Sequence, residues 1–484
     1  MIDSRYEMVI GLEVHVQMQT RSKIFCGCST QFGQGANTQI CPVCSGFPGV
    51  LPVLNQEAVQ MAIKTGIAIH GQVRPVSEFS RKNYFYPDLP AGYQITQFEL
   101  PIVEHGHLDL HTESRGAKRI GITRIHMEVD AGKSLHEGIV GGSWVDLNRT
   151  GTPLMEIVSE PDMRSSAEAG EYLKKLRAIV RYLGVSDGNM EQGSFRCDAN
   201  VSVRLKGAEK FGTRCELKNM NSIRNVMRAI EYEAERHIDV IESGGHIVQQ
   251  TRLWDANANL SRPMRGKEEA HDYRYFPEPD LPPLHLTEER IETIASSMPE
   301  LPETKKERFI EEYALSDYDA EVLTNSLELA DYFEAVARTV AEKGQADPKA
   351  AANWVTVELL GVLNKEGLEI TQSPVPAAHL GKLIYLIQNN TISGKIAKQV
   401  FATLFETGKD PEIIVSEKGL KQVTDSSAIE EEVEKVLAAN AKEVELYRGG
   451  KTKLIGFFVG QVMKATRGKA NPGLVNSILR QKLG

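Results

Sequence analysis

The sequence predicts an α+β protein in which an antiparallel sheet is followed by helices. Up to about residue 286 the chain reads as short alternating strands separated by Gly and Pro turns. From about residue 287 onward, apolar residues recur at helical spacing instead. The composition, 41% apolar and 25% charged, is that of an ordinary globular protein. We therefore expect a sheet domain, then a helical domain, then a small helical module.

The 484 residues suggest about three domains. We place the sheet domain at residues 1–290, the helical domain at 291–405 and the last module at 406–484. Within the sheet domain, apolar residues at helical spacing predict helices over Ser165–Leu183 and Ser222–Ile241.

The sequence also indicates a compartment. The N-terminus carries early acidic residues and lacks the basic start and apolar core of a signal peptide. No run of 18 apolar residues indicates a bilayer span. Six Cys in 484 residues are too few for a disulfide scaffold. We expect a cytoplasmic protein without a membrane partner.

Charge is distributed unevenly along the chain. The 56 basic and 65 acidic residues give a net charge of −9. Residues 448–484 hold eight basic and no acidic residues, so the rest of the chain sums to −17. A basic end on an acidic body indicates a docking site for phosphates, and a solvated helical face is the alternative. The candidate nucleic-acid contacts are Lys451, Lys453, Lys464, Arg467 and Lys469.

Five expected strands share an unusual polar face. Because successive strand side chains alternate, Met8–Met18 would present Glu13 and His15 on the face opposite its apolar residues. Such polar faces are rich in Glu, His, Asp, Asn and Arg, which bind Mg²⁺ and phosphates. A wet sheet with ion pairs is the alternative interpretation. The other four strands are Arg124–Asp130, Val145–Asn148, Arg196–Arg204 and Arg214–Lys218.

Two triplets resemble the end of a phosphate-binding P-loop but lack its beginning. The first glycine of that motif would have to replace Met127 before Gly132-Lys133-Ser134, and Glu445 before Gly450-Lys451-Thr452. Any ATP site in this chain must therefore be of a less common kind.

Four cysteines form two close pairs, Cys26 with Cys28 and Cys41 with Cys44, separated by 12 residues. Two thiol pairs joined by a loop suit tetrahedral Zn²⁺, and four Cys ligands leave no open position for catalysis. We therefore predict a structural zinc site, and reduced, partly buried thiols are the alternative.

Long stretches of the chain match a known family. They are VIGLEVHVQ, PGVLPVLN, RKNYFYPDLPAGYQITQ, RIHMEVDAGKS, VDLNRTGTPLMEIVSEPD, GSFRCDANVSVR, ELKNMNS and HDYRYFPEPDL. On these motifs the chain resembles the B subunits of the glutamyl/aspartyl-tRNA amidotransferases, the GatB family. Its tail, GKTKLIGFFVGQVMKATRGKANPGLVNSILRQKL, is similar to YqeY proteins. The resemblance implies a cradle-like catalytic sheet domain and a YqeY-like module that binds tRNA.

The resemblance also implies a reaction and its partners. ATP with Mg²⁺ phosphorylates the side-chain carboxylate of misacylated Glu-tRNA(Gln), of Asp-tRNA(Asn) or of both. Ammonia then displaces the phosphate and leaves the amide. An amidase partner releases the ammonia from glutamine, and a small third protein, the C-type partner, completes the heterotrimer. The nondiscriminating synthetase that charges the tRNA is a further candidate partner.

Site residues follow from the same motifs. The resemblance implies that Glu13, His15, Glu128 and Glu216 surround the Mg²⁺, and with Lys218 they make up the expected catalytic set. The groups expected to hold phosphates or developing charge are Arg149, Asn200, Lys218 and Asn219. The residues expected near the ammonia route are Lys82, Tyr84 and Tyr86.

Two other functions are compatible with parts of the sequence. A noncatalytic tRNA-binding adaptor would use the polar faces only to present RNA. Acidic strand faces argue against it, because carboxylates repel a phosphate backbone unless a cation intervenes. A zinc-dependent hydrolase fails because the Cys cluster has no open ligand position.

Overall fold

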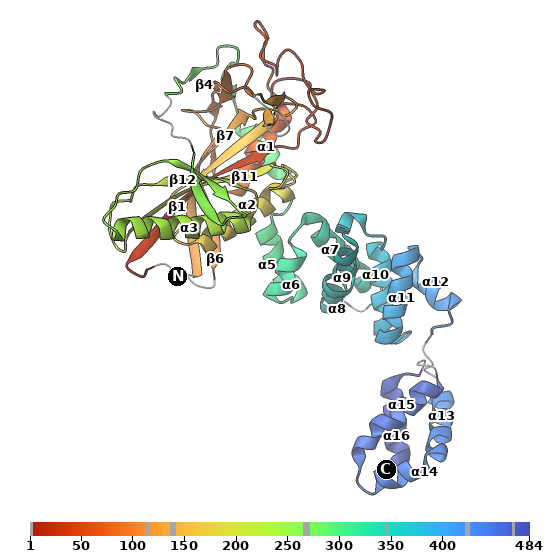
Figure 1. Cartoon of the computed structure of the whole chain (residues 1–484). Coiled ribbons are helices and arrows are strands. Elements are labelled where there is room, and N and C mark those ends of the chain that lie inside the picture. Colours follow the sequence, from red (N-terminus) through yellow and green to blue (C-terminus); the bar gives the residue numbers. More distant parts are fainter. Residues whose placement is uncertain are drawn as a thin grey trace. The chain divides into compact units, whose positions relative to one another are not determined.

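The computed structural model describes residues 3–112, 116–135, 142–264, 272–344, 346–421, 426–466 and 470–484. The chain divides into two compact units, Met1–Leu301 and Pro302–Gly484. The strands lie in the first unit, and the described part of the second is helical (Figure 1). The expected α+β class, with the sheet first, is confirmed.

Unit 1 is built on a sheet of twelve described strands. Ten follow the order β14-β13-β12-β11-β1-β10-β7-β5-β4-β15, while β6 pairs with β7 and β2 with β6. Every pair is antiparallel except β12 with β13. The bounds are β1 Tyr6–Gln17, β2 Gln72–Val73, β4 Ser80–Asn83, β5 Tyr93–Thr96, β6 Val103–Thr112, β7 Gly116–Val129, β10 Pro153–Ser159, β11 Phe195–Leu205, β12 Cys215–Met220, β13 Thr251–Asp255, β14 Leu260–Pro263 and β15 Phe276–Pro277.

Two short ribbons lie outside this sheet. One pairs β3 (Val76–Ser77) with β16 (Leu284–His285), and the other pairs β8 (Lys133–Leu135) with β9 (Trp144–Asp146). The expectation that Val145–Asn148 shares a face with the other four strands is therefore wrong. Its place in the large sheet is taken by β10, which pairs with both β1 and β7.

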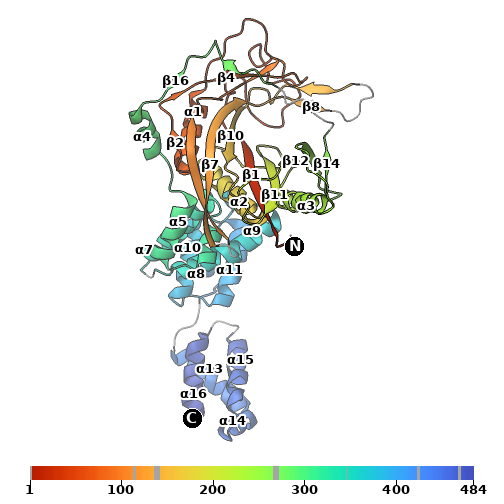
Figure 2. The same ribbon diagram turned by 90° about the vertical axis from the view of Figure 1, so that its left-hand side faces the viewer.

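Two helices of unit 1 begin directly after a serine that caps their first turn. Ser165 caps α2 (Ser166–Tyr182) and Ser222 caps α3 (Ile223–Glu242), each by accepting a backbone N–H of the first turn. Both helices agree with the predicted ranges, and both pack together and against the sheet (Figure 2). Two further helices, α1 (Gln56–Ala68) and α4 (Glu288–Ser296), pack on each other.

Strand β1 shows how the core forces one polar face. Its residues Ile10, Leu12, Val14 and Val16 are at most 1% exposed and belong to the main hydrophobic core. Because side chains alternate along a strand, burying this set turns the intervening side chains to the other face. The polar side chains of β1 are therefore all presented together.

Unit 2 contains two separate hydrophobic cores. The first joins α5–α12 and runs from Phe309 to Val415, and the second joins α13, α15 and α16 and runs from Ile429 to Leu483. A boundary at residue 405 would fall inside α11, and this core continues into α12. The division into 1–290, 291–405 and 406–484 stays a prediction.

The bounds of these helices are α5 Pro302–Tyr313, α6 Asp317–Leu323, α7 Leu327–Glu342, α8 Pro348–Asn353, α9 Leu360–Glu366, α10 Ala377–Gln388, α11 Gly394–Thr407, α12 Pro411–Glu417, α13 Ser426–Ala439, α14 Ala441–Arg448, α15 Ile455–Ala465 and α16 Pro472–Leu483. A π-helical segment, Trp354–Leu359, joins α8 to α9, and 3-10 turns cover Ile370–Gln372 and Thr452–Leu454. None of the helices in the described ranges is long and apolar enough to cross a bilayer.

Candidate active site

A carboxylate–histidine cluster lies where β1, β10 and β7 run side by side. The register sets His15 of β1 opposite Glu156 of β10, and Glu156 opposite His126 of β7. The Nε2 atoms of His15 and His126 lie 3.4 Å and 3.2 Å from Glu156 Oε2. Ligand atoms of His15, Glu128 and Glu156 all lie within 4.8 Å of one another. One divalent cation could therefore contact all three side chains.

Burial and mutual charge set the protonation of this cluster. Burial alone would lower the pKa of His126, but Glu156 and Glu128 together raise it to about 9. Burial likewise opposes the charged form of His15, whose pKa is raised chiefly by Glu156. Burial would raise the pKa values of Glu128 and Glu156, but His126 lowers both. A cation that binds the imidazole of His15 must displace its proton.

A second polar group lies beside the first, on β1, β11 and β12. Asn200 Nδ2 donates to Glu13 Oε1 at 2.9 Å, and Asp198 lies directly opposite Glu13. Lys218 contacts Asp198 and lies 3.0 Å from Glu216 Oε1. Burial, followed by the charges of the neighbouring carboxylates, raises the pKa of Glu13. This group is thus a carboxylate set with one cation.

Asp130 joins the end of β7 to the loop that carries Arg149. Its Oδ2 accepts from Gln17 Nε2 at 2.6 Å and from Arg196 Nη2 at 3.0 Å, and it lies 3.6 Å from Arg149 Nε. Burial would raise the pKa of Asp130, but Arg196 and Arg149 lower it. Arg149 also donates to the backbone oxygens of residues 131 and 132, so both guanidiniums are held at the edge of the polar face.

Three residues are expected near the ammonia route, Lys82, Tyr84 and Tyr86. Lys82 lies on β4 with its Nζ 5.0 Å from the ring centroid of Tyr273. Burial would lower its pKa, but the charge of Glu128 raises it. Tyr84 and Tyr86 pack edge to face.

Asn219, an expected phosphate contact, does not point into the second polar group. It has a positive φ of 69°, and its amide donates to the Trp254 backbone oxygen on β13 rather than joining Glu216 and Lys218.

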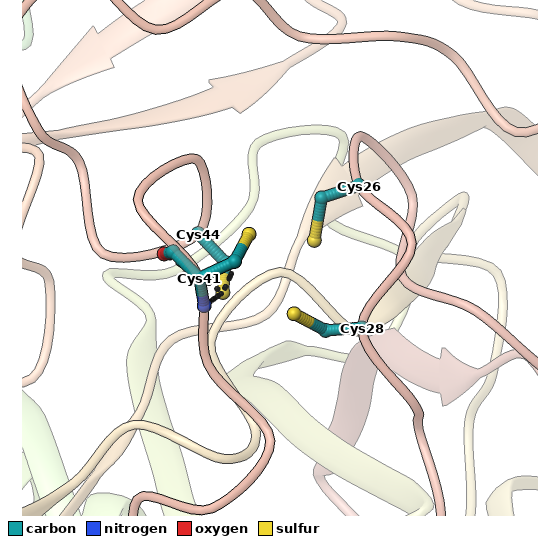
Figure 3. Close-up of side chains that lie close together, drawn as sticks. All are labelled: Cys26, Cys28, Cys41 and Cys44. Atoms are coloured by element: carbon teal, nitrogen blue, oxygen red, sulfur yellow. Dashed lines mark hydrogen bonds between the residues drawn. The ribbon is translucent and has the colours of Figure 1, made fainter.

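The four cysteines come together from two loops (Figure 3). Cys26 and Cys28 lie on one loop and Cys41 and Cys44 on the other, with all four Sγ atoms within 4.8 Å of one another. A tetrahedral zinc with Zn–S bonds of about 2.3 Å separates its sulfurs by roughly 3.8 Å, and Cys41 Sγ and Cys44 Sγ lie 3.9 Å apart. A hydrogen bond from Cys26, with the nearby ammonium of Lys23, lowers the pKa of Cys44 to about 4. The donor set therefore fits zinc.

The basic tail presents part of its expected surface. Lys451, Lys453 and Lys464 are exposed, and Lys464 lines a hollow of about 470 Å³ between α13 and α15. Arg467 and Lys469 lie outside the described residues.

Comparison with known proteins decides the family. Residues 8–292 match the model described as the GatB/GatE catalytic domain, and residues 331–483 match the GatB domain. The chain is 60% identical over 478 residues to the B subunit of the aspartyl/glutamyl-tRNA(Asn/Gln) amidotransferase of Alkalilimnicola ehrlichii, covering 99% of both chains. It is 58% identical over 481 residues to the same protein of Solidesulfovibrio magneticus, covering 99% of this chain and 100% of that relative.

The chain belongs to the GatB family. The resemblance inferred from the sequence motifs is thus confirmed, and so is the expectation of an amidotransferase subunit. The adaptor interpretation is not favoured. The roles of individual residues remain predictions.

The sequence interpretation missed Glu156. The strand Pro153–Ser159 reads PLMEIVS, and only its central Glu interrupts an otherwise apolar run. An acidic residue in the middle of a strand with this burial must meet a counter-charge, so the lone Glu was the available signal. The structure gives it two imidazoles, those of His15 and His126.

The cluster predicts the titration of His126. Replacing Glu156 by Gln removes the largest group that favours its imidazolium, so we expect the pKa of His126 to fall by at least one unit from about 9. NMR titration of histidine-labelled protein measures this. Glu160→Gln, an exposed change at the end of the same segment, serves as control. An unchanged His126 titration in Glu156→Gln would contradict the electrostatic account.

Proposed function

We propose that this chain phosphorylates the side-chain carboxylate of Glu-tRNA(Gln), of Asp-tRNA(Asn) or of both with ATP, and then replaces the phosphate by ammonia. The observation that supports this most is the continuous polar face, on which His15, Glu128 and Glu156 meet within reach of one cation. A carboxylate resists attack by ammonia until phosphorylation supplies a leaving group, and phosphoryl transfer depends on positioned cations. The names of the relatives state the same class of substrate.

Mg²⁺ is the cation we assign to this face. His15, Glu128 and Glu156 would hold it. Glu13 and Glu216, which the family motifs also suggest for the Mg²⁺, lie in the neighbouring group on β1 and β12. When bound, Mg²⁺ offsets the negative charge on the transferring phosphoryl group. The donor set fits, because carboxylate oxygens dominate it.

The cationic side chains around the face would orient ATP and the acyl phosphate. Lys218 is held by Asp198 and Glu216, so its ammonium is already positioned when a phosphate arrives. Arg149 and Arg196 share Asp130 in the same manner. Asn200 keeps Glu13 in one orientation. We assign Asn219 a supporting part in the bend of β12, because its amide binds the backbone of β13.

The ammonia would come from outside this chain. We infer an amidase partner as its source and a small C-type protein as the third member of the heterotrimer, with Lys82, Tyr84 and Tyr86 lining the approach to Glu128. The position of Lys82, half-buried with its Nζ 5.0 Å from the ring centroid of Tyr273, supports this assignment, as does Glu128, whose charge raises the pKa of Lys82 against the effect of burial. Enclosure matters because ammonia in neutral water is mostly ammonium, which has no lone pair for attack.

The zinc site, the tRNA contacts and the compartment are further parts of the proposal. We infer a structural Zn²⁺ at Cys26, Cys28, Cys41 and Cys44, and tRNA contacts at Lys451, Lys453, Lys464, Arg467 and Lys469. We place the complex in the cytoplasm, where misacylated tRNA and the nondiscriminating synthetase are found. The adaptor alternative predicts tRNA binding without ATP turnover.

Ammonium-dependent amidation tests the proposed reaction directly. The chain, co-expressed with its C-type partner and without a glutaminase, is incubated with Glu-tRNA(Gln), ATP, Mg²⁺ and ammonium chloride. We expect Gln-tRNA(Gln) and one ADP per amide. If tRNA binds but no ADP forms, the amidase partner is added, and continued absence of ADP would favour the adaptor.

Substitution of Glu128 tests the metal assignment. Glu128→Gln removes a charged ligand while keeping the shape, so we expect tRNA-dependent amidation to fall on the order of 100-fold or more. Glutamine hydrolysis by the assembled complex should persist, because that chemistry belongs to the amidase partner. Glu160→Gln is the matched control, and near-normal amidation by Glu128→Gln would refute the role.

Deletion of residues 422–484 tests the tail. The cut leaves the core that runs from Phe309 to Val415 intact and removes only the second core of unit 2. We expect tRNA affinity at fixed salt to fall roughly tenfold or more, because phosphate contacts are lost. The KM for ATP should stay within twofold. A filter-binding titration gives the first value, and equal tRNA affinity would contradict the assignment.

A further inference from the structure

Lys23 is a buried ammonium with no carboxylate partner among the residues that the structure describes. Its side chain is fully buried, and its Nζ donates to the Gln39 backbone oxygen at 2.7 Å and to the Leu147 backbone oxygen at 3.5 Å. In the described ranges the hydrogen-bond partners of this Nζ are two backbone oxygens and one cysteine sulfur, and none of them is a carboxylate. Burying an uncompensated charge is costly, so the negative partner has to be sought among other groups.

The cysteine cluster provides that partner. Lys23 Nζ lies 3.4 Å from Cys44 Sγ. Four thiolates around one divalent cation carry two excess negative charges, because coordinating thiols are deprotonated. A single ammonium at this distance offsets part of that excess where water is excluded. The two backbone oxygens satisfy hydrogen bonds of the Lys23 ammonium, and a filled tetrathiolate centre would supply the negative charge that they lack.

The same side chain ties the cluster to a neighbouring segment, residues 145–151, which begins in β9 and continues as the loop after it. Lys23 reaches the Leu147 carbonyl, and the adjacent Ile24 N–H donates to the Gly151 carbonyl at 2.9 Å. Gly151, with φ +84°, packs so closely that a Cβ there would meet Cys44 Cβ at 3.3 Å and Lys23 Cδ at 3.4 Å. Only glycine combines this conformation with this approach.

The loop between the two cysteine pairs grips the same segment. Asn37 Nδ2 donates to the Val145 carbonyl at 2.9 Å, and Asn37 Oδ1 accepts from the Leu147 N–H at 2.8 Å. Gln39 N–H donates to Asn148 Oδ1 at 2.8 Å. The backbone oxygen of Gln39 also accepts a hydrogen bond from the Lys23 ammonium. Hydrogen bonds therefore join the cysteine cluster and Lys23 to residues 145–148 as one body.

This body ends at the polar face of the large sheet. Arg149 follows the gripped residues directly and lies 3.6 Å from Asp130, which also accepts from Gln17 and Arg196. Gly151 N–H donates to the Asp130 carbonyl at 2.9 Å. The position of the loop therefore determines where the Arg149 guanidinium is presented.

We propose that Lys23 is a positioning residue that neutralises the metal–thiolate cluster and locks it to the loop carrying Arg149. The cluster thereby holds part of the active site in place. This inference rests on the proposed zinc centre. Groups that hold metal ligands from outside typically change metal affinity by 10–100-fold when removed.

The test measures zinc in the full-length chain in complex with its partner proteins. Wild type, Lys23→Met, Lys23→Gln and the exposed control Lys210→Met are compared by metal analysis, by competition with a chromophoric chelator and by the sulfur-to-metal absorption of Co²⁺-substituted protein. We expect one zinc per wild-type chain, with affinity reduced about 10–100-fold in Lys23→Met. Lys23→Gln, which keeps a donor but not the charge, should be similarly weak, and the Co²⁺ band should shift in both.

A second measurement follows residues 144–152 directly, and its comparison of loaded with zinc-stripped wild type needs no substitution. Hydrogen–deuterium exchange of residues 144–152 should be at least tenfold faster in wild type stripped of zinc and in zinc-loaded Lys23→Met than in loaded wild type. Strand β12 serves as the internal reference and should not change.

The outcomes separate two failures. Wild type purified without chelator and found to contain no zinc overturns the zinc centre itself. Wild type with one zinc, but with unchanged affinity and Co²⁺ spectrum in both Lys23 variants, overturns only the role of Lys23. If the exchange rate of residues 144–152 does not change when zinc is removed from wild type, the link between the cluster and the Arg149 loop is overturned. This comparison holds even if a Lys23 variant fails to fold.

Discussion

The antiparallel register of β1 is the constraint on which the site depends. Its two neighbours, β10 and β11, set Glu156 and Arg196 on either side of His15. Because side chains alternate with a period of two, a slip of one residue would bury the polar set and expose the apolar set. The core residues of β1, at most 1% exposed, make such a slip very unfavourable. Hydrophobic burial thus fixes the face on which the catalytic candidates lie, and their mutual contacts form on a face that the core has already selected.

The charged side chains on this face are buried, so each one requires an opposite charge close by. Glu128 is 3% exposed and His126 is 5% exposed, so neither is stabilised mainly by water. Breaking a buried pair leaves an uncompensated charge at a cost of several kcal/mol. Without a metal ion, the imidazolium of His126 therefore offsets the negative charge of the carboxylates. A bound divalent cation would offset the same charge.

How far sequence predicts this arrangement differs between residues. Period-two alternation places Glu13, His15, Glu128, Glu216 and Lys218 on polar strand faces, because one side of each strand must face a core, and the family motifs single them out among the other polar residues there. Alternation cannot tell which strands are neighbours, since pairing is non-local. The short polar stretch at 145–148 was therefore assigned to the wrong sheet, and Glu156, on the strand that takes its place, was overlooked. The cysteine pairs were found by spacing alone, but their dependence on Lys23 needed coordinates.

The distribution of charge explains why one chain needs distinct parts. A face with carboxylates on β1, β7, β10, β11 and β12 repels phosphates, so it accepts ATP or an RNA terminus only together with cations. Affinity for a tRNA body cannot come from such a surface, because it depends on releasing counterions from contacts with Lys and Arg. The residues after 447, which contain no acid, meet that requirement. Some of this charge is internally neutralised, since Lys482 pairs with Glu430 and Glu434 of α13. Among the described residues of the tail, Lys451, Lys453, Lys464 and Arg480 are exposed. Because they belong to a different unit from the acidic sheet, a surface for binding phosphates and a surface for chemistry can be optimised independently.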